Sequence, residues 1–365
     1  MATPPADKSK LRTGYSTGAC TTAAAVAALR ALLTQRGQSE VGIRLPIGRD
    51  VTFAVKRCEF GPDRATCSVV KDAGDDPDVT DKAELTVTVA WSGPGLRLEG
   101  GPGVGRVTRE GLGIPVGELS ITPVPRKHLL ENLAREVGVA LEKKGLTVTI
   151  EVPGGEAMAA KTLNHRLGIV GGISILGTTG LVIPFSTAAY RESIVQAVDV
   201  AIAAGLDEVV ITTGGKSEQY AQVHLKDLPE TAFVQMGDFV GFTLRTCRKK
   251  ALRRATIAGM IGKLSKMAKG KMQTHAAGSE VDMGLLSQIA AEAGASPEVV
   301  AQVKTANTGR HVGEIVQAAG VAGFFDAVCR RVADNALKHV KGGMAVRVLL
   351  VDFDGKLLGR AEAGP

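Results

Sequence analysis

The second half of the chain alternates short apolar runs with segments of helical periodicity. Its first run, LGIVGGISILGTTG at 167–180, is short, apolar and rich in β-branched residues, which predicts a buried parallel strand ending in a Gly/Thr turn. From 185 to 205 the apolar positions recur every three or four residues, which predicts a helix. A strand, a Gly/Thr turn and a helix form a layout that binds anionic or nucleotide-like ligands at the carboxyl end of a sheet.

The same alternation continues to the end of the chain. Further strands are expected at 208–215, 232–241 and 255–264, further helices at 217–225, 243–253, 282–294, 296–304 and 310–340, and a last hairpin with an Asp-Gly turn. This order of elements predicts a doubly wound, mainly parallel sheet with helices on its faces.

The first part of the chain has a different pattern. Val/Thr-rich runs between 41 and 98 predict strands, and an Ala/Leu run after Thr22 predicts a helix. A second helix is expected at 127–144 and a strand at 146–152. The fold class is therefore α/β (α+β overall). We expect a strand-rich α+β domain at 1–152 and a Rossmann-like α/β domain at 153–365, with the closing hairpin a candidate to pack back on the first domain.

Polar and glycine residues follow three of the expected strands. They are Gly177, Thr178, Thr179 and Gly180 after the first strand, Thr213, Gly214 and Gly215 after the second, and Asp238 after the third. Both Gly-rich turns fail the P-loop pattern, because Val210 stands where the first glycine is needed before GKS and Thr178 stands where the lysine is needed after Gly177. Asp238 is either an ordinary turn aspartate or an acid that accepts from ribose hydroxyls.

The start of the Ala-rich helix is crowded with hydroxyl groups. Ser16, Thr17, Thr21 and Thr22 stand there together with two glycines. One reading is ordinary capping, since Ser and Thr cap helices well. The other is a carboxylate or phosphate site at the helix start, and both remain open.

Two charged loops and one histidine segment complete the candidate chemistry. The GGPGVG loop at 100–105 is followed by Arg106 and Arg109, and is either structural or a cover for a ligand. The acidic stretch 71–78 does not match an EF-hand, so a turn or a loop facing a substrate is expected rather than a metal site. His275 and Asp282 lie in a segment with basic, hydroxyl and acidic neighbours, where a structural role and a catalytic role are equally compatible.

Composition narrows the class of protein. The 365 residues are 44% hydrophobic, typical of a globular chain, and no apolar run approaches the ~20 residues of a membrane span. Five cysteines without a CxxC, and no apolar signal segment, indicate a reduced, cytoplasmic protein without a disulfide framework or zinc site. The net charge of +7 favours acidic partners, and it is concentrated at 245–254 and 263–271.

Several of these stretches together carry a family resemblance. GYSTGAC, GGPGVGRVTREGLGIPVGE, NHRLGIVGGISILGTTG, ITTGGKSE and MGDFVGF occur in this order over almost the whole chain, which resembles the CbiD family. Members more often have Thr where this chain has Ser16. The resemblance implies methylation of C-1 of cobalt-precorrin-5B by S-adenosylmethionine, giving cobalt-precorrin-6A in anaerobic cobalamin biosynthesis, with the cobalt held by the substrate and not by a protein metal site.

The resemblance and the motifs combine into one hypothesis. The three strand-end turns bind S-adenosylmethionine, while Ser16, Thr17, Thr21, Arg106, Arg109 and the basic stretches hold the carboxylates of the corrinoid substrate. His275 assists proton movement, with Asp282 as a nearby acid. The expected partner is thus a small molecule, not nucleic acid or membrane, and a homo-oligomer is compatible with the sequence. The rival is a nucleic-acid-binding protein using 245–254 and 263–271, which lacks aromatic residues interleaved with its basic runs.

Overall fold

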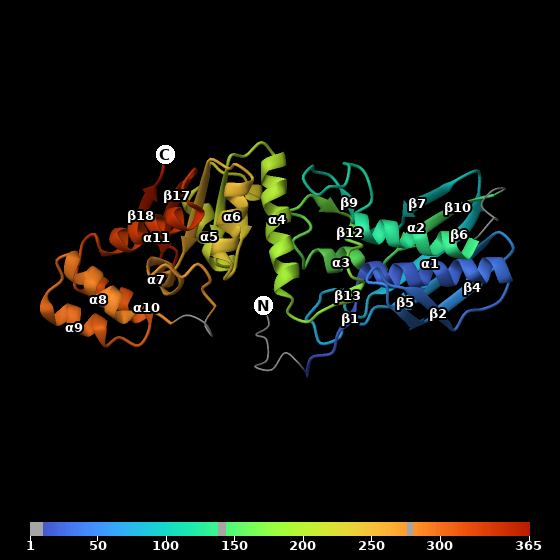
Figure 1. Cartoon of the computed structure of the whole chain (residues 1–365), viewed down its shortest axis with the longest axis horizontal. Helices are drawn as coiled ribbons and strands as arrows, with labels where there is room; N and C mark the ends of the chain where they lie inside the picture. The colour runs from blue at the N-terminus through green and yellow to red at the C-terminus, as the bar shows by residue number, and fades with distance from the viewer. Residues whose placement is uncertain (1–9, 138–143, 276–279) are drawn as a thin grey trace. The chain divides into compact units, whose positions relative to one another are not determined.

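The computed structural model describes residues 10–137, 144–275 and 280–365 (Figure 1). They form two compact units, Met1–Thr187 and Ala188–Pro365. The boundary therefore lies later than the expected one after residue 152. The reason is strand pairing: β11 (Ile169–Val170) pairs with β9 (Arg106–Val107), and β12 (Gly172–Ile173) pairs with β8 (Gly103–Val104), so the segment after 152 completes the first unit.

The first unit is built on a five-stranded sheet in the order β4-β5-β6-β10-β7. Its strands are β4 (Arg57–Phe60), β5 (Arg64–Val70), β6 (Glu84–Ser92), β7 (Leu96–Gly100) and β10 (Gly145–Glu151). Around it lie β1 (Gly14–Tyr15), β13 (Leu181–Val182), the hairpin of β2 (Glu40–Arg44) and β3 (Asp50–Ala54), and α3 (Gly155–Ala159). The Val/Thr alternation predicts these strands because one face of the sheet is buried.

Helices α1 (Thr17–Thr34) and α2 (Pro123–Val137) lie side by side, and α1 packs on β5 and β6 (Figure 1). The Ala-rich helix is confirmed; its small side chains let it sit deep in the core. By length and composition α1 could cross a membrane, yet 83% of it is buried inside the unit, as in the core helix of a globular protein. For the second helix, residues 138–143 of the expected span lie outside the described residues.

His128 links these two helices through a buried hydrogen-bond chain. Its Nε2 lies 2.6 Å from the carbonyl oxygen of Arg44, which can only accept, so this nitrogen carries a proton. Its Nδ1 lies 3.0 Å from Thr22 Oγ1. Burial lowers the pKa of His128 below its usual value, although the Arg44 carbonyl opposes this.

The stability of the first unit should therefore fall on acidification. The unfolded chain binds a proton at His128 from about pH 6.5 downward, whereas the folded unit binds it only at lower pH, so stability is lost as the pH falls from that value towards the folded pKa. Hydrogen exchange of the α1 amides at pH 7.5 and 5.5 measures this. His128→Gln should have a smaller loss than the wild type; an equal loss in both would contradict the assignment.

The second unit carries the doubly wound sheet that its sequence predicts. The strand order is β15-β14-β16-β17-β18, with β14 (Glu208–Thr212), β15 (Phe233–Gln235), β16 (Arg254–Gly259) and β17 (Ala345–Val351) parallel and β18 (Leu357–Ala363) antiparallel at the edge. The closing hairpin thus belongs to this sheet and does not join the first unit. The order reverses between β14 and β16, and such a switch point is where ligands bind in this fold.

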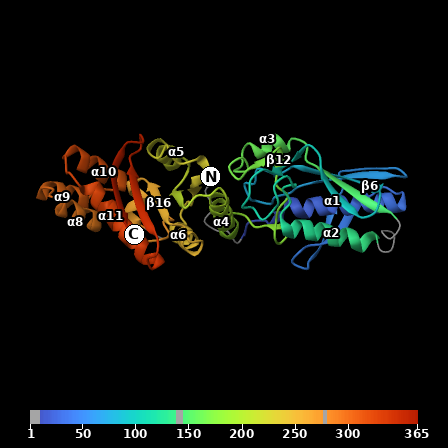
Figure 2. The same cartoon turned by 90° about the horizontal axis from the view of Figure 1, so that it is seen from above.

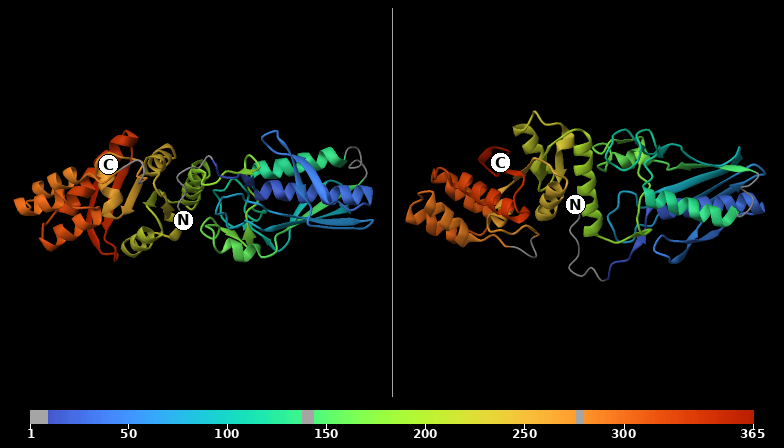
Figure 3. Two further views of the ribbon diagram at one scale, coloured as in Figure 1. Left: turned by 90° about the horizontal axis from the view of Figure 1, so that it is seen from below. Right: turned by 45° about the horizontal axis from the view of Figure 1, so that its top comes forward.

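Helices cover both faces of this sheet. α5 (Gly215–His224) packs on the face of Val210, Ala258 and Leu349. The other face is covered by α4 (Thr187–Ala203), α6 (Val240–Lys249), α7 (Ile261–Ala268) and α11 (Phe324–Val340). Figure 2 shows α5 and α6 on opposite sides of β16. α8 (Met283–Glu292), α9 (Pro297–Lys304) and α10 (Gly309–Ala318) form a helical group beside α7 and α11, drawn in orange in Figure 3.

Three expected elements have different limits. The strand expected at 255–264 ends at Gly259, and α7 begins at Ile261. The expected strand is too long because both elements are buried, so the apolar run in the sequence continues across their boundary. The helix expected at 310–340 is two helices, interrupted at Gly320 and Gly323, which both have positive φ. The strand expected at 232–241 covers only Phe233–Gln235.

Glu208 anchors an ion-pair network at the amino ends of the strands. Its carboxylate lies 3.1 Å from Arg254 and 3.6 Å from Arg347 and accepts from Thr256 Oγ1 at 2.8 Å. The Glu208 side chain is only 10% exposed. Arg254 and Arg347 also pair with the more exposed Glu362, at 3.2 and 3.0 Å. Glu208→Gln removes the most buried acid of this network and leaves Glu362 alone to compensate the two cations, so we expect a loss of about 2 kcal/mol in the free energy of unfolding by urea.

The exposed pair of Glu292 and Arg331 gives a matched control for this prediction. Glu292→Gln should cost less than about 1 kcal/mol. Equal losses in the two variants would show that the Glu208 network contributes no more than a surface pair.

Candidate functional site

Three sequence motifs of the first unit converge on the start of α1. The Tyr15 amide donates to the carbonyl of Asp72 in the acidic loop, at 2.8 Å. The amides of Ser16 and Gly18 donate to the carbonyls of Gly180 and Leu176, each at 3.0 Å. The helix start, the acidic loop and the Gly/Thr turn therefore form one packed junction.

Two of the three predicted hydroxyls at this junction, those of Ser16 and Thr17, have structural partners. Ser16 caps α1 by accepting from the Ala19 amide at 3.2 Å, which confirms the capping reading. Thr17 Oγ1 accepts from the Leu176 amide at 2.9 Å and donates to the Ser174 carbonyl at 3.1 Å. Thr21 is equally buried, and its hydroxyl has no hydrogen-bond partner among the described residues. Ser16 and Thr17 contact the 174–180 segment, and all three side chains are buried, so we do not retain them as contacts to a large substrate.

The acidic loop is held by its own carboxylates. Asp72 pairs with Arg12, and Asp78 accepts from the fully buried Lys71 at 2.7 Å. Asp76 accepts from the Phe185 amide at 2.8 Å. These contacts explain the acids as turn-forming groups, and they do not support the expectation that the loop faces a substrate.

The turn of Gly177, Thr178, Thr179 and Gly180 is not a strand end of the doubly wound sheet. The run before it forms β11 and β12 of the first unit, of which β11 is antiparallel to its partner. At Gly177, with φ 126°, an added Cβ would lie 2.3 Å from Ser16 Cβ. This turn belongs to the first unit, where Gly177 packs closely against Ser16 at the start of α1 and Gly180 against Leu45.

The other two predicted turns do meet at the carboxyl edge of the second unit's sheet. Asp238 follows β15, and its Oδ1 accepts from Thr274 Oγ1 at 2.9 Å and lies 3.1 Å from Lys263 Nζ. The same ammonium donates to the carbonyl of Thr213, at the end of β14, at 3.2 Å. Thr213, Asp238, Lys263 and Thr274 therefore form one polar cluster at the switch point.

The start of α5 borders this cluster. Gly214 caps the helix without a side chain, and the hydroxyls of Thr213 and Ser217 lie 3.1 Å apart. Thr212 Oγ1, at the last residue of β14, is buried without a hydrogen-bond partner among the residues that the structure describes. The start of α5, whose cap is a glycine, therefore presents backbone amides at the switch point, which is suited to binding a polar ligand.

The cluster keeps Asp238 ionised. Burial by itself would raise the pKa of Asp238, but the Lys263 charge, hydrogen bonds from Lys263 and Thr274, and the positive charge of His275 outweigh burial and lower it. Burial, and then the charge of Asp238, raise the pKa of the nearby Tyr190. The side chain of His275 is exposed. It acts on Asp238 through its charge, so His275 belongs to the surroundings of this aspartate.

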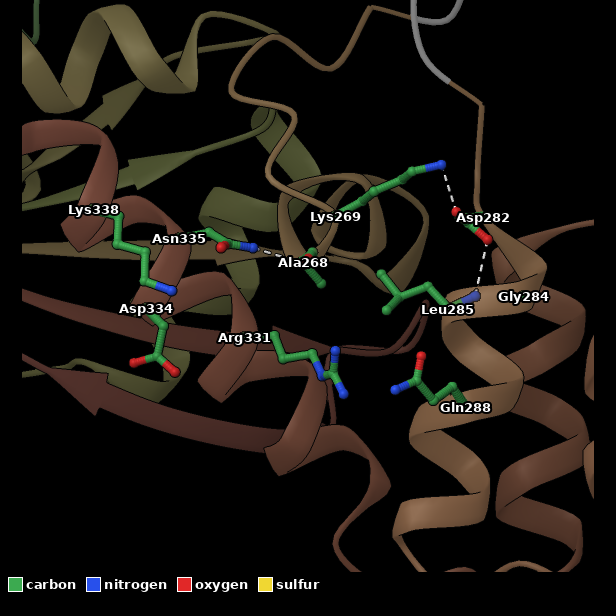
Figure 4. Close-up of a pocket in the computed structure, with 10 residues that line it drawn as sticks. All are labelled: Ala268, Lys269, Asp282, Gly284, Leu285, Gln288, Arg331, Asp334, Asn335 and Lys338. Atoms are coloured by element: carbon green, nitrogen blue, oxygen red, sulfur yellow. Dashed lines mark hydrogen bonds and ion pairs between the residues drawn. The ribbon is translucent and has the colours of Figure 1, made fainter.

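Asp282 has a different environment. It caps α8 by accepting from the Leu285 amide at 2.9 Å, and it pairs with Lys269 at 2.5 Å (Figure 4). The Lys269 hydrogen bond lowers the pKa of Asp282. It lines a polar pocket of about 610 Å³ between the end of α7, the start of α8 and α11. The capping bond and the ion pair account for this aspartate without a catalytic role.

The predicted arginines of the first unit are exposed beside an apolar pocket. Arg106 donates to the carbonyl of Gly117, and Arg109 packs along Gly168 and donates to the Arg166 carbonyl at 3.2 Å. A pocket of about 510 Å³ lies between residues 113–121 and the start of α2. Its lining is Gly113, Ile114, Pro115, Glu118, Ile121, Pro123, Arg126, Lys127, Leu130 and Glu131.

Three of the six cations in the basic stretch 245–254 are paired with acids. Lys250 pairs with Asp199, Arg253 with Asp207 at 2.7 Å, and Arg254 with Glu208. These three cations compensate acids of their own unit, so the stretch presents less charge to a nucleic acid than its sequence indicates. The nucleic-acid alternative is not supported.

Sequence reasoning missed Lys263 and Thr274 as site residues. Lys263 was included only as one charge in the stretch 263–271, and Thr274 as a neighbour of His275. The available signal for Lys263 was its position in the first helical turn after a parallel strand. To use this signal, the end of β16 had to be placed correctly. Within the described ranges, no group of three or more His, Cys, Asp or Glu side chains could hold a metal ion.

The fold and this cluster define an α+β protein with a polar ligand site at the switch point of a doubly wound sheet. The CbiD family profile matches residues 4–184, and the profile of the CbiD C-terminal domain matches residues 273–362. The chain belongs to the CbiD family.

Curated relatives agree with this assignment. The chain is 52% identical to a cobalt-precorrin-5B C(1)-methyltransferase of Geobacillus sp. (strain WCH70), over 97% of both chains. It is 49% identical to the enzyme of that name from Priestia megaterium, over 98% of both. The crystal structure of the cobalamin biosynthesis protein CbiD from Archaeoglobus fulgidus is 25% identical and covers 85% of both chains, with a TM-score of 0.39.

Proposed function

We infer that this chain is a C-methyltransferase that methylates C-1 of cobalt-precorrin-5B, giving cobalt-precorrin-6A in cobalamin biosynthesis. One observation carries this function. Relatives named for that reaction are identical to this chain at about half of the aligned residues, over nearly its full length. Cobalt enters as part of the substrate. We propose S-adenosylmethionine as the methyl donor, since a C-methyltransferase needs an electrophilic methyl group.

The switch-point cluster has the groups that such a donor needs. Asp238 is an ionised acceptor for ribose hydroxyls, and Thr213, Gly214 and Gly215 present a helix start without a bulky side chain. We therefore assign the donor to these residues, and not to the turn at 177–180.

Bound S-adenosylmethionine supplies a methyl group on a sulfonium, ready for in-line attack by a carbon nucleophile. The chain's own residues then have to orient the two reactants and exclude water. These two effects account for much of the rate of such a transfer. Asp238 also places a negative charge near the sulfonium. His275, exposed beside Asp238, is the group we propose for proton movement.

The corrinoid is an apolar macrocycle with many carboxylates around its rim. Arg106 and Arg109 are exposed cations that match the carboxylates, and the largely apolar pocket of the same unit matches the ring. We propose this surface of the first unit as the substrate side. A cytoplasmic location and a homo-oligomer are further expectations from the sequence.

Anaerobic incubation with cobalt-precorrin-5B and S-adenosylmethionine tests the function. The product should gain one methyl group by mass spectrometry, and omission of the donor should abolish the gain. An unchanged mass with folded protein and intact donor would refute the activity.

A further inference from the structure

The ammonium group of Lys263 joins the ends of three strands. Lys263 lies in the first turn of α7, directly after β16. Its Nζ donates to the carbonyl of Thr213 after β14 and lies 3.1 Å from Oδ1 of Asp238 after β15. Because β14 lies between β15 and β16, this side chain spans the carboxyl edge of the sheet at its switch point.

Asp238 is held firmly by this arrangement. Its Oδ1 receives both the Lys263 ammonium and the Thr274 hydroxyl, and its carbonyl accepts from the Thr274 amide at 3.2 Å. Lys266 Nζ in turn donates to the Thr274 carbonyl at 3.2 Å. The carboxylate is therefore anchored at one oxygen before any ligand arrives, which is the preorganisation that binding sites need.

We propose that Lys263 is the positioning residue of the donor site: it holds Asp238 as an oriented anion that accepts from the ribose hydroxyls of S-adenosylmethionine. The inference rests on the proposed function. Lys263 acts through Asp238 and stabilises the strand-end geometry on which the nucleoside part of the donor depends.

The electrostatic surroundings give this role a measurable signature. Asp238 is faced by Lys263 from α7, by His275 from the segment after α7 and by Tyr190 from α4. Burial raises its pKa and Lys263 is the strongest influence lowering it. Without Lys263, the pKa of Asp238 rises, so the carboxylate is protonated at a higher pH and becomes a weaker, uncharged hydrogen-bond acceptor.

Isothermal titration of the full chain with S-adenosylmethionine between pH 5 and 8 tests this role. We expect Lys263→Met to bind about tenfold more weakly at pH 7.5 and to lose further affinity, relative to the wild type, as the pH falls. Lys263→Arg should restore most of the affinity and the wild-type profile.

The Lys250–Asp199 pair gives a matched control. Its side chains are exposed to nearly the same extent as those of Lys263 and Asp238, but Lys250 ends α6, near the amino ends of the strands. Lys250→Met should bind like the wild type. A Lys263→Met protein with wild-type affinity and profile overturns the inference, as does a pH-independent loss that arginine does not rescue. A wild type that binds no S-adenosylmethionine overturns the donor site itself, and with it the role of Lys263.

Discussion

Asp238→Ala should weaken the binding of S-adenosylmethionine by at least about tenfold, because hydrogen bonds to a charged acceptor contribute about 1.5–3 kcal/mol. The carboxylate is ionised and anchored at the strand ends, where a nucleoside's ribose hydroxyls are commonly bound. Isothermal titration at pH 7.5 measures the effect. Methyl transfer should fall with it at donor concentrations below the new dissociation constant.

The loss must be separated from misfolding. Asp238→Asn retains the shape and one acceptor oxygen, so it should bind with intermediate affinity. Asp199→Ala removes an aspartate from a similar ion pair of the same unit and should bind normally. Unchanged affinity of Asp238→Ala would sink the ribose assignment.

Gly14→Ala should destabilise the first unit by about 3 kcal/mol or more. An added Cβ would lie 2.1 Å from the carbonyl carbon of Ala73 and 2.4 Å from the amide nitrogen of Gly74. Both are backbone atoms, so no side-chain rotation relieves the overlap. The junction must separate, which costs more than ordinary overpacking of a core. Urea denaturation, monitored by hydrogen exchange of the α1 amides, measures the loss in the free energy of unfolding.

Gly42 is the matched control in the same unit. It lies in β2 with nothing within 4 Å of its added Cβ. Gly42→Ala should change stability by less than about 1 kcal/mol, and towards greater stability if the unfolded chain loses freedom. Similar stabilities for Gly14→Ala and Gly42→Ala would show that the helix start does not require the close approach to the acidic loop.

Local pattern was enough to predict most of the elements. The helix of α1, the strands of the first sheet and the parallel strands of the second unit all follow from periodicity, because each element buries one face or both. Asp238 and the Thr213–Gly215 turn could be placed near one another, since consecutive parallel strands bring their carboxyl ends to one edge. Local pattern also predicted the turn that closes the last hairpin.

The run at 167–180, by contrast, needed its partners. The same sequence pattern, an apolar segment followed by a Gly/Thr turn, is expected for a strand of a parallel sheet and for two short strands that pair with β8 and β9. Which pairing forms depends on residues far away in the chain. The same holds for the packing of Gly177 against Ser16, and for the ion pairs that Asp199, Asp207 and Glu208 form with part of the basic stretch 245–254.

The sequence alone thus determined the class of fold, the family and the acid at the strand ends. Only the tertiary structure showed that the turn at 177–180 supports α1, and that Lys263 and Thr274 surround Asp238. The physical reason is that periodicity reports which faces are buried, whereas a site depends on which buried faces meet, and that is set by packing between distant segments.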